Sequence, residues 1–442
     1  MIQIPRFDVA LEPLPGVDRM VLSGGPSFGI VSIRIHFDHG TASEPDEVSG
    51  LLDVALTMLD RGTHSMPRLV LSRAFERLGA SLGVRAFRTS WYVDLTVLEE
   101  YLDQALDLLL AYLTDSAFDA DELSDVLTEA EEEAETALED PSGILARMNG
   151  PVLWSGTAWE HHPDGRVETR RRIRAEMLAP RMLEALGAKA VAGIAAEDPG
   201  RHAKAVAGWM AKLRALVPVN KSEKVRRPPI RTGAVSAART RGGAQAALML
   251  SAPAPSSLDE SWDAVVLHNA AFGSGFMTPL VQRVRGKEGL SYGIGSTLVP
   301  DREESLFAVQ CSPQGSKAAY TASVCLDAWE RFVETPMTDS YLDQVKSFYL
   351  GTLLMRAETV RQRMGQAVQY AASNRPVSEL WEHPQRLSEL DAASVSAVAS
   401  RYGFGTGSYI VVCALPKGIS DPGWKRHFDA LPREGVHLRR LR

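Results

Sequence analysis

The order of apolar and polar residues predicts strands and helices along the first half of the chain. Apolar and polar side chains alternate from Ile30 to Phe37, which predicts a half-buried strand. The nearly all-apolar run from Gly50 to Leu59 predicts a helix that is buried on most sides. The same reasoning predicts a further strand over 92–97 and helices over 69–78, 101–113 and 120–139.

A polar segment over 217–233 separates this half from a second one. It contains paired prolines and charges without periodicity, so we predict a linker between residues 1–216 and residues 234–442. Strands and helices follow in a similar order in both halves, which predicts a duplicated α+β fold with antiparallel sheets and helices packed on one face. In the second half we predict strands over 245–251, 305–311 and 407–413, and helices over 258–271, 317–334, 340–356 and 359–372.

Length, composition and charge indicate a soluble protein with more than one domain and exclude several other classes of protein. A chain of 442 residues is too long for one ordinary core, and 45% hydrophobic with 23% charged residues is typical of a soluble globular protein. The net charge of −7 gives no reason to expect nucleic-acid binding. The three cysteines are far apart in apolar segments, which favours buried, reduced thiols. We find neither a signal peptide nor a membrane-spanning stretch, and therefore expect a cytoplasmic protein without a membrane partner.

The segment over 271–295, AFGSGFMTPLVQRVRGKEGLSYGIG, combines several local signals. Gly273 and Gly275 flank a serine in what we predict to be a tight or left-handed turn. Apolar residues at helical spacing follow, and the segment then presents Arg285 and Tyr292, seven positions apart. The helix-spaced apolar residues are Met277, Leu280, Val281 and Val284.

This pattern resembles the second half of the pitrilysin-like (M16) metallopeptidases, the family of the mitochondrial processing peptidase (M16B type). Its members carry a Gly-rich turn, a short helix, an arginine and then Gly-Leu-x-Tyr. The resemblance implies that Arg285 and Tyr292 hold the backbone of an extended peptide substrate. It also implies a part in substrate recognition for the turn at Gly273 and Gly275. It implies, further, two homologous halves that face each other as a clamshell.

The first half resembles the same family but lacks its zinc motif. Active members carry H-x-x-E-H on a helix, where two histidines bind zinc and the glutamate activates water. Aligned on the flanking glycines, these positions fall on Asp53, Leu56 and Thr57, so every one is replaced. The downstream glutamate that completes the zinc shell aligns with Glu133, a vestigial ligand position. We therefore predict no catalytic residue and no metal in this chain.

In heteromeric M16 peptidases, two subunits divide the work in a way that matches a chain with a replaced zinc motif and a retained Arg285–Tyr292 motif. One subunit holds zinc, and a zinc-less partner closes the chamber and helps to hold the peptide. The resemblance thus implies a non-catalytic subunit of a heterodimer, with zinc in an H-x-x-E-H-bearing partner and a peptide as substrate. Whether that peptide is a precursor, such as that of a redox cofactor, or a general oligopeptide stays open.

Two other classes of function remain as alternatives. The chain could be a structural or assembly protein, like the core subunits of respiratory complexes that resemble M16 peptidases and cleave nothing. It could also be a peptidase with a relocated metal site, for which the histidine pairs at 36 and 39 and at 161 and 162 are candidates. Metal bound to the isolated chain would favour the second alternative.

Overall fold

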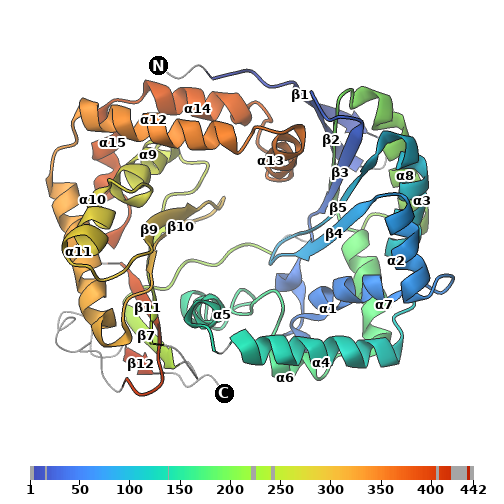
Figure 1. Ribbon diagram of the computed structural model, residues 1–442, viewed down its shortest axis with the longest axis horizontal. Coiled ribbons are helices and arrows are strands. Elements are labelled where there is room, and N and C mark those ends of the chain that lie inside the picture. Colours follow the sequence, from blue (N-terminus) through green and yellow to red (C-terminus); the bar gives the residue numbers. More distant parts are fainter. Residues whose placement is uncertain are drawn as a thin grey trace.

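The chain folds into two halves, each built on one six-stranded sheet, which face each other across the middle of the molecule (Figure 1). This computed structural model describes residues 4–14, 17–137, 139–220, 225–239, 244–404, 408–419 and 436–438. The predicted α+β class and the clamshell of two similar halves are confirmed.

The first sheet has the strand order β1-β2-β6-β3-β5-β4. Neighbouring strands are antiparallel except β2 and β6, which run parallel, so the sheet is mixed where the sequence predicted antiparallel pairing alone. The strand predicted over 30–37 is β3, with the predicted bounds. The strands are β1 (Val9–Leu14), β2 (Val17–Gly24), β3 (Ile30–Phe37), β4 (Ser81–Ala86), β5 (Trp91–Leu98) and β6 (Ala190–Ala196).

The second sheet repeats this arrangement with the order β12-β7-β11-β8-β10-β9. Here β7 runs parallel to both β11 and β12, and the other neighbours are antiparallel. The strand predicted over 305–311 is β10, again with the predicted bounds. The strands are β7 (Ala234–Arg239), β8 (Ala247–Ala254), β9 (Ile294–Val299), β10 (Ser305–Cys311), β11 (Ile410–Leu415) and β12 (Val436–Leu438).

Helices cover one face of each sheet and bury its alternating apolar side chains. In the first half Ile33, Ile35 and Phe37 of β3 lie in one core with residues of α1, α3, α7 and α8. The first-half helices are α1 (Leu51–Met58), α2 (Arg68–Arg77), α3 (Leu102–Thr114), α4 (Ala120–Ala137), α5 (Pro141–Leu153), α6 (Val167–Arg170), α7 (Ala175–Leu186) and α8 (Gly200–Leu216).

The second half is covered in the same way, and its core also contains the three cysteines, which are buried and free as predicted. Its helices are α9 (Trp262–Gly273), α10 (Pro279–Val281), α11 (Ala318–Glu334), α12 (Asp339–Met355), α13 (Val360–Ala372), α14 (Glu379–Glu389) and α15 (Ala392–Ala397).

Each half also lends one helix to the opposite face of the other half's sheet, which the sequence pattern did not predict. α13 packs on β6 and β2, and α5 packs on β11 and β8 (Figure 1). α13 lies so close to β6 that a Cβ atom at Gly193 would be 2.5 Å from Val368 Cγ2. Only glycine fits there, so the two halves share helices and are not joined by the 217–233 segment alone.

Both exchanged helices have well-defined N-termini. Asp140 caps α5 by accepting hydrogen bonds from two backbone N–H groups, and Pro141 occupies the first helical position. α13 begins with a capping box in which Thr359 and Gln362 each accept the other's backbone N–H. Local sequence therefore fixes where each crossing helix starts.

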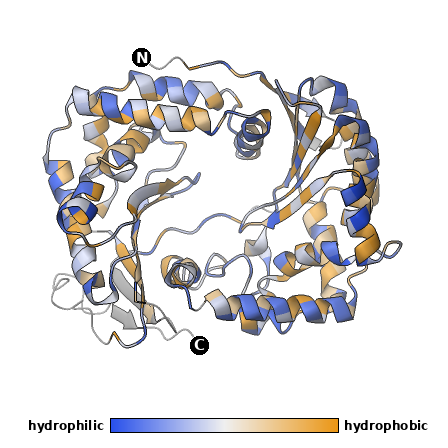
Figure 2. Cartoon of the chain, viewed as in Figure 1, coloured by the Kyte–Doolittle hydropathy of each residue, from blue (hydrophilic) through white to orange (hydrophobic). Residues whose placement is uncertain are grey.

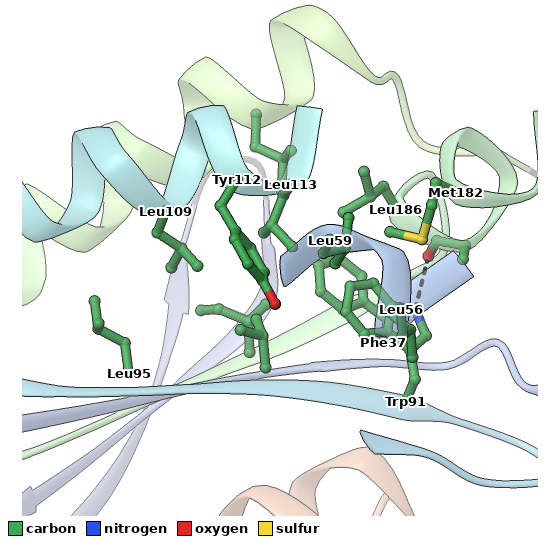
Figure 3. Close-up of a cluster of buried hydrophobic side chains, with 14 of the residues drawn as sticks. Phe37, Leu56, Leu59, Trp91, Leu95, Leu109, Tyr112, Leu113, Met182 and Leu186 are labelled. Atoms are coloured by element: carbon green, nitrogen blue, oxygen red, sulfur yellow. Dashed lines mark hydrogen bonds between the residues drawn. The ribbon is translucent and has the colours of Figure 1, made fainter. Parts of the chain in front are cut away.

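The hydrophobic core of the first half surrounds α1. Phe37 stacks on Trp91 with ring centroids 4.3 Å apart, and the indole N–H of Trp91 donates to the carbonyl of Ala185 at 3.2 Å (Figure 3). Hydrophilic residues cover the outward faces of the surrounding helices (Figure 2). None of the helices in the described ranges combines the length and apolar content needed to cross a bilayer.

Candidate functional site

The helix that aligns with the zinc-binding helix is α1, and its first turn is held by a buried carboxylate. α1 follows Gly50, which has φ of +96°, a conformation that glycine adopts without strain. The two carboxylate oxygens of Glu44 accept hydrogen bonds from the backbone N–H groups of Gly50 and Leu52, both at 2.6 Å. Burial raises the pKa of Glu44 to about 7, against the opposing charge of Arg181, 3.5 Å away.

The three zinc-motif positions have diverged into different structural roles. Leu56 is 2% exposed and lies in the core beside Phe37 and Trp91 (Figure 3). Thr57 is exposed, and its hydroxyl donates to the carbonyl of Asp53 at 3.0 Å. Of the three side chains, only that of Asp53 offers a charged oxygen, so this face of α1 has no pair of ligands one turn apart and no general base between them.

A guanidinium from the protein itself neutralises Asp53. Arg170, at the end of α6, is buried and places Nη2 3.3 Å from Asp53 Oδ2. Its Nε donates to the carbonyl of Asp164, and Nη2 lies 3.8 Å from the Asp164 carboxylate. Burial raises the pKa of Asp53 to about 6, although the charge of Arg170 acts in the opposite direction.

Asp164 is the centre of this charged cluster. Its carboxylate contacts Nδ1 of His162 and accepts a hydrogen bond from Arg147 Nη2 at 2.8 Å, in addition to its contact with Arg170. Burial would raise the pKa of Asp164, but the hydrogen bond with His162 and the positive charges around it outweigh that effect and lower the pKa. Asp53, Asp164 and the three basic side chains therefore form an internally neutralised network, which we call the Arg170 cluster.

The residues around α1 do not fit a zinc ion. Zinc requires several nitrogen, sulfur or carboxylate ligands, whereas here a carboxylate is already paired with a guanidinium. Glu133, the vestigial ligand position, is exposed on α4 and acts on Asp53 only through its charge. Within the described ranges, no group of three or more His, Cys, Asp or Glu side chains is arranged to hold a metal.

Neither glycine of the 271–295 segment forms the predicted left-handed turn, and Gly273 serves close packing instead. α9 ends at Gly273, where a Cβ atom would be 2.5 Å from Ser296 Oγ of β9. Neither Gly273 nor Gly275 has a positive φ, whereas Gly289 does, at +59°. Because α9 continues to the first of these glycines, the turn begins later than the sequence predicted.

The short helix that follows also begins later than predicted. α10 begins at Pro279 and continues as a π-helical turn over Gln282–Lys287. Leu280, Val281 and Val284 are buried as predicted, but Met277 precedes the helix and is 78% exposed. The predicted apolar face is therefore confirmed except at Met277.

Arg285 and Tyr292 lie together on the surface of this segment. The guanidinium carbon of Arg285 is 4.3 Å from the Tyr292 ring centroid and 5.9 Å from that of Phe276. Tyr292 and Phe276 are 82% and 75% exposed. The nearby Arg283 is paired with Glu288 at 2.5 Å and Asp327 at 3.3 Å, whereas no carboxylate in the described ranges is within ion-pair distance of Arg285. Arg285 is thus available to a ligand in a way that Arg283 is not.

A cavity of about 1310 Å³ lies between the halves. Its wall includes His36 from β3, Arg226 and Arg227 from the linking segment, residues 295–298 of β9, and parts of α12 and α13. Gly273 lines it, whereas Asp53, Arg285 and Tyr292 are not among its lining residues. Figure 1 places α1 and α10 in opposite halves, so the structure joins Arg285 to Tyr292 but does not join either to the α1 site.

Sequence reasoning missed the Arg170 cluster. Arg170 belongs to a short basic run that is typical of a solvated surface, and its partner Asp53 is 117 positions away. No local pattern links the two residues. His162 and its neighbour His161 were candidates for metal binding, but each contacts an aspartate instead, Asp164 and Asp46 respectively.

Comparison with known proteins gives consistent family matches. Residues 19–149 match the family described as insulinase (peptidase family M16), and residues 193–349 match the family described as the M16 peptidase inactive domain. An uncharacterized zinc protease of Bacillus subtilis is 22% identical over 350 residues, covering 78% of this chain and 84% of that protein. One of Streptomyces coelicolor is 23% identical over 359 residues, with coverage of 78% and 76%.

Solved structures share the fold. A crystal structure described as a peptidase M16 inactive domain from Pseudomonas fluorescens superposes with a TM-score of 0.83 at 20% identity, covering 93% of this chain and 98% of that one. A protease from Helicobacter pylori gives a TM-score of 0.80 at 15% identity, with coverage of 94% and 100%.

Proposed function

The chain belongs to the M16 family of peptidases, and on this premise we propose that it is the non-catalytic, peptide-holding subunit of a heterodimeric zinc peptidase. The observation that carries the proposal is the contrast between its two motif regions. The α1 site is neutralised by Arg170, while Tyr292 is exposed and the half-buried Arg285 contacts the rings of Tyr292 and Phe276 and no carboxylate within the described ranges.

In this role Arg285 and Tyr292 orient the peptide. The guanidinium has five N–H donors and the phenol has one O–H donor, so both can donate hydrogen bonds to carbonyl groups of an extended chain. Their ring–guanidinium stacking at 4.3 Å limits the freedom of both side chains before the peptide binds, which lowers the entropic cost of binding. Orientation of the scissile peptide, and not a covalent step, is the contribution of this chain.

The chemical step is assigned to a partner subunit with an intact H-x-x-E-H helix. Zinc in that partner would polarise the scissile carbonyl and activate water. The two chains meet in the cytoplasm in this proposal, and together they enclose the peptide between their halves. This chain closes the chamber, and its own α1 region serves as packing and not as a metal platform.

The test is capture of the tagged chain from its native host, followed by mass spectrometry of proteins present in equal amount. The proposal expects a chain of similar size with an intact H-x-x-E-H motif. Recovery of the chain alone, or with membrane proteins, would contradict the proposal and favour a structural or assembly role. Metal bound in stoichiometric amount to the isolated chain would instead favour a relocated metal site.

A further inference from the structure

The cavity between the halves is positively charged although the whole chain is negative. Five arginines line it, against two aspartates and one glutamate, whereas the full chain has a net charge of −7. A concave surface with low-dielectric walls strengthens the field of the charges that line it. The cavity should therefore attract negatively charged groups despite the charge of the molecule as a whole.

Not all of these arginines are neutralised by neighbours. Arg227 lies 3.7 Å from Asp301 and stacks on Trp154, and Arg375 is paired with Glu379 at 3.0 Å. These two arginines are therefore committed to internal contacts.

Arg302 and Arg356 differ from them. The Nη1 of Arg302 donates to the carbonyl of Ser373 at 3.0 Å, and no carboxylate in the described part of the chain lies within 4 Å of either guanidinium. Both side chains are exposed on the cavity wall, one in the turn after β9 and the other at the end of α12. They keep their charge free for a ligand.

A free sheet edge forms another wall of the same cavity. β9 is the last strand of its sheet and, within the described residues, β10 is the one strand that pairs with it, so its outer edge has no strand partner. One β9 carbonyl, that of Ser296, already accepts a hydrogen bond from Ser274 Oγ at 3.2 Å. Residues 295–298 of β9 line the cavity, and β9 begins two positions after Tyr292. A peptide held by Arg285 and Tyr292 can therefore continue along β9 for about 20 Å and enter the cavity as an added strand.

We propose that this cavity selects peptides that carry acidic side chains in the part of the peptide that lies along β9. The inference rests on the proposed function, since it assigns a substrate class to the peptide-holding role. The backbone of the peptide pairs with the open edge of β9, and its carboxylates meet Arg302 and Arg356. Neutral and basic peptides of the same length lose these charge-assisted contacts.

The test uses the full-length chain and three fluorescent peptides of equal length with alternating Glu, Gln or Lys. Fluorescence anisotropy should show that the Glu peptide binds about tenfold more tightly than its Gln isostere, and that added salt reduces the difference. The variant Arg302→Gln/Arg356→Gln should bring the Glu peptide to within about twofold of the Gln peptide. Arg73→Gln/Arg77→Gln, which makes the same change in charge on the exposed face of α2, should leave the preference intact.

The outcomes separate this inference from the proposed function. Equal affinities for the three peptides, tighter binding of the Lys peptide, or no binding of any peptide would overturn the acidic preference. Capture of a zinc-bearing partner is measured independently, so a partner without acidic preference contradicts the substrate class alone. A loss of preference in the control variant equal to that in the cavity variant would show that net charge, and not the cavity, determines binding.

Discussion

The α1 site and the Arg285–Tyr292 segment lie in opposite halves of the molecule, and their charges are used in opposite ways. Around α1, the carboxylate of Asp53 is matched by a buried guanidinium 3.3 Å away. In the second half, Arg285 has a tyrosine ring as its neighbour and no carboxylate within ion-pair distance in the described ranges. The charges of the first region therefore neutralise one another, while the charge of Arg285 stays without an opposite charge beside it. The difference shows that the α1 region of this chain serves structure through internal ion pairs, whereas the second region leaves an arginine without a carboxylate partner in the described ranges.

The most severe test of this comparison is to restore the zinc motif. Asp53→His/Leu56→Glu/Thr57→His places a carboxylate where Leu56 is now 2% exposed among apolar side chains. We expect a loss of roughly 3–5 kcal/mol in the free energy of unfolding, because a charge is buried and packing is lost. Urea denaturation measures the loss, and metal analysis should find no stoichiometric zinc.

The matched control is Asp53→His/Thr57→His, which leaves Leu56 in the core. It should fold with a much smaller loss of stability. A triple variant that keeps wild-type stability and binds one zinc per chain would contradict the view that α1 has become a packing element.

Removal of the internal counter-charge should give the next largest effect. Arg170→Leu leaves Asp53 and Asp164 facing each other without their shared guanidinium. We expect roughly 2–3 kcal/mol of destabilisation, below the value for a fully buried pair because both carboxylates are partly exposed. Arg171→Leu, at the adjacent and exposed arginine, should leave the urea midpoint nearly unchanged. If the two substitutions lowered the free energy of unfolding equally, Arg170 would not be a stabilising counter-charge for Asp53 and Asp164.

Substitutions of Arg283 and Arg285 should separate the effect on protein stability from the effect on peptide binding. Arg283→Ala breaks contacts with Glu288 and Asp327 and should cost up to about 1 kcal/mol. Arg285→Ala breaks no ion pair and should cost less, yet it should weaken peptide binding where Arg283→Ala does not. Thermal melts and anisotropy on the same samples measure both. The comparison would fail if Arg283→Ala weakened peptide binding as much as Arg285→Ala.

The smallest expected effect concerns pH. The pKa of Asp53 is raised from 3.8 to about 6 in the folded protein, so the folded state binds this proton more tightly than the unfolded state. The contribution of this group to stability is therefore greatest below pH 3.8 and is lost as pH rises through about 6. Relative to wild type, Asp53→Asn should be more stable at pH 8 than at pH 5, as melting temperatures at both pH values would show. A difference that is independent of pH would place the pKa of Asp53 elsewhere.

Local sequence patterns predicted the elements well where one periodicity dominated. The alternation from Ile30 to Phe37 and the mainly apolar run at 305–311 predicted strands with the observed bounds. The acidic helix begins as expected, with Asp119 accepting the backbone N–H of Asp121 at 2.8 Å. These features depend on residues that are close in sequence, so they can be predicted from the sequence alone.

Features that depend on distant neighbours were not predictable in the same way. The exchange of α5 and α13 between the halves depends on apolar side chains on the second face of each sheet, which a local pattern does not assign to a partner. The pairing of Arg170 with Asp53 depends on the fold alone, across 117 positions. In contrast, Arg285 and Tyr292 are seven positions apart in one short segment, so a local motif is enough to name both, and their side chains are in contact.

The most direct measurement of the central claim is peptide cleavage by the complex of this chain with its captured partner. With the wild-type chain we expect cleavage, and with Arg285→Ala or Tyr292→Phe we expect the complex and its zinc content to be unchanged while cleavage falls at least about tenfold. Undiminished cleavage by both variants would show that this pair does not hold the substrate. Cleavage by the isolated chain, without any partner, would contradict the division of labour itself.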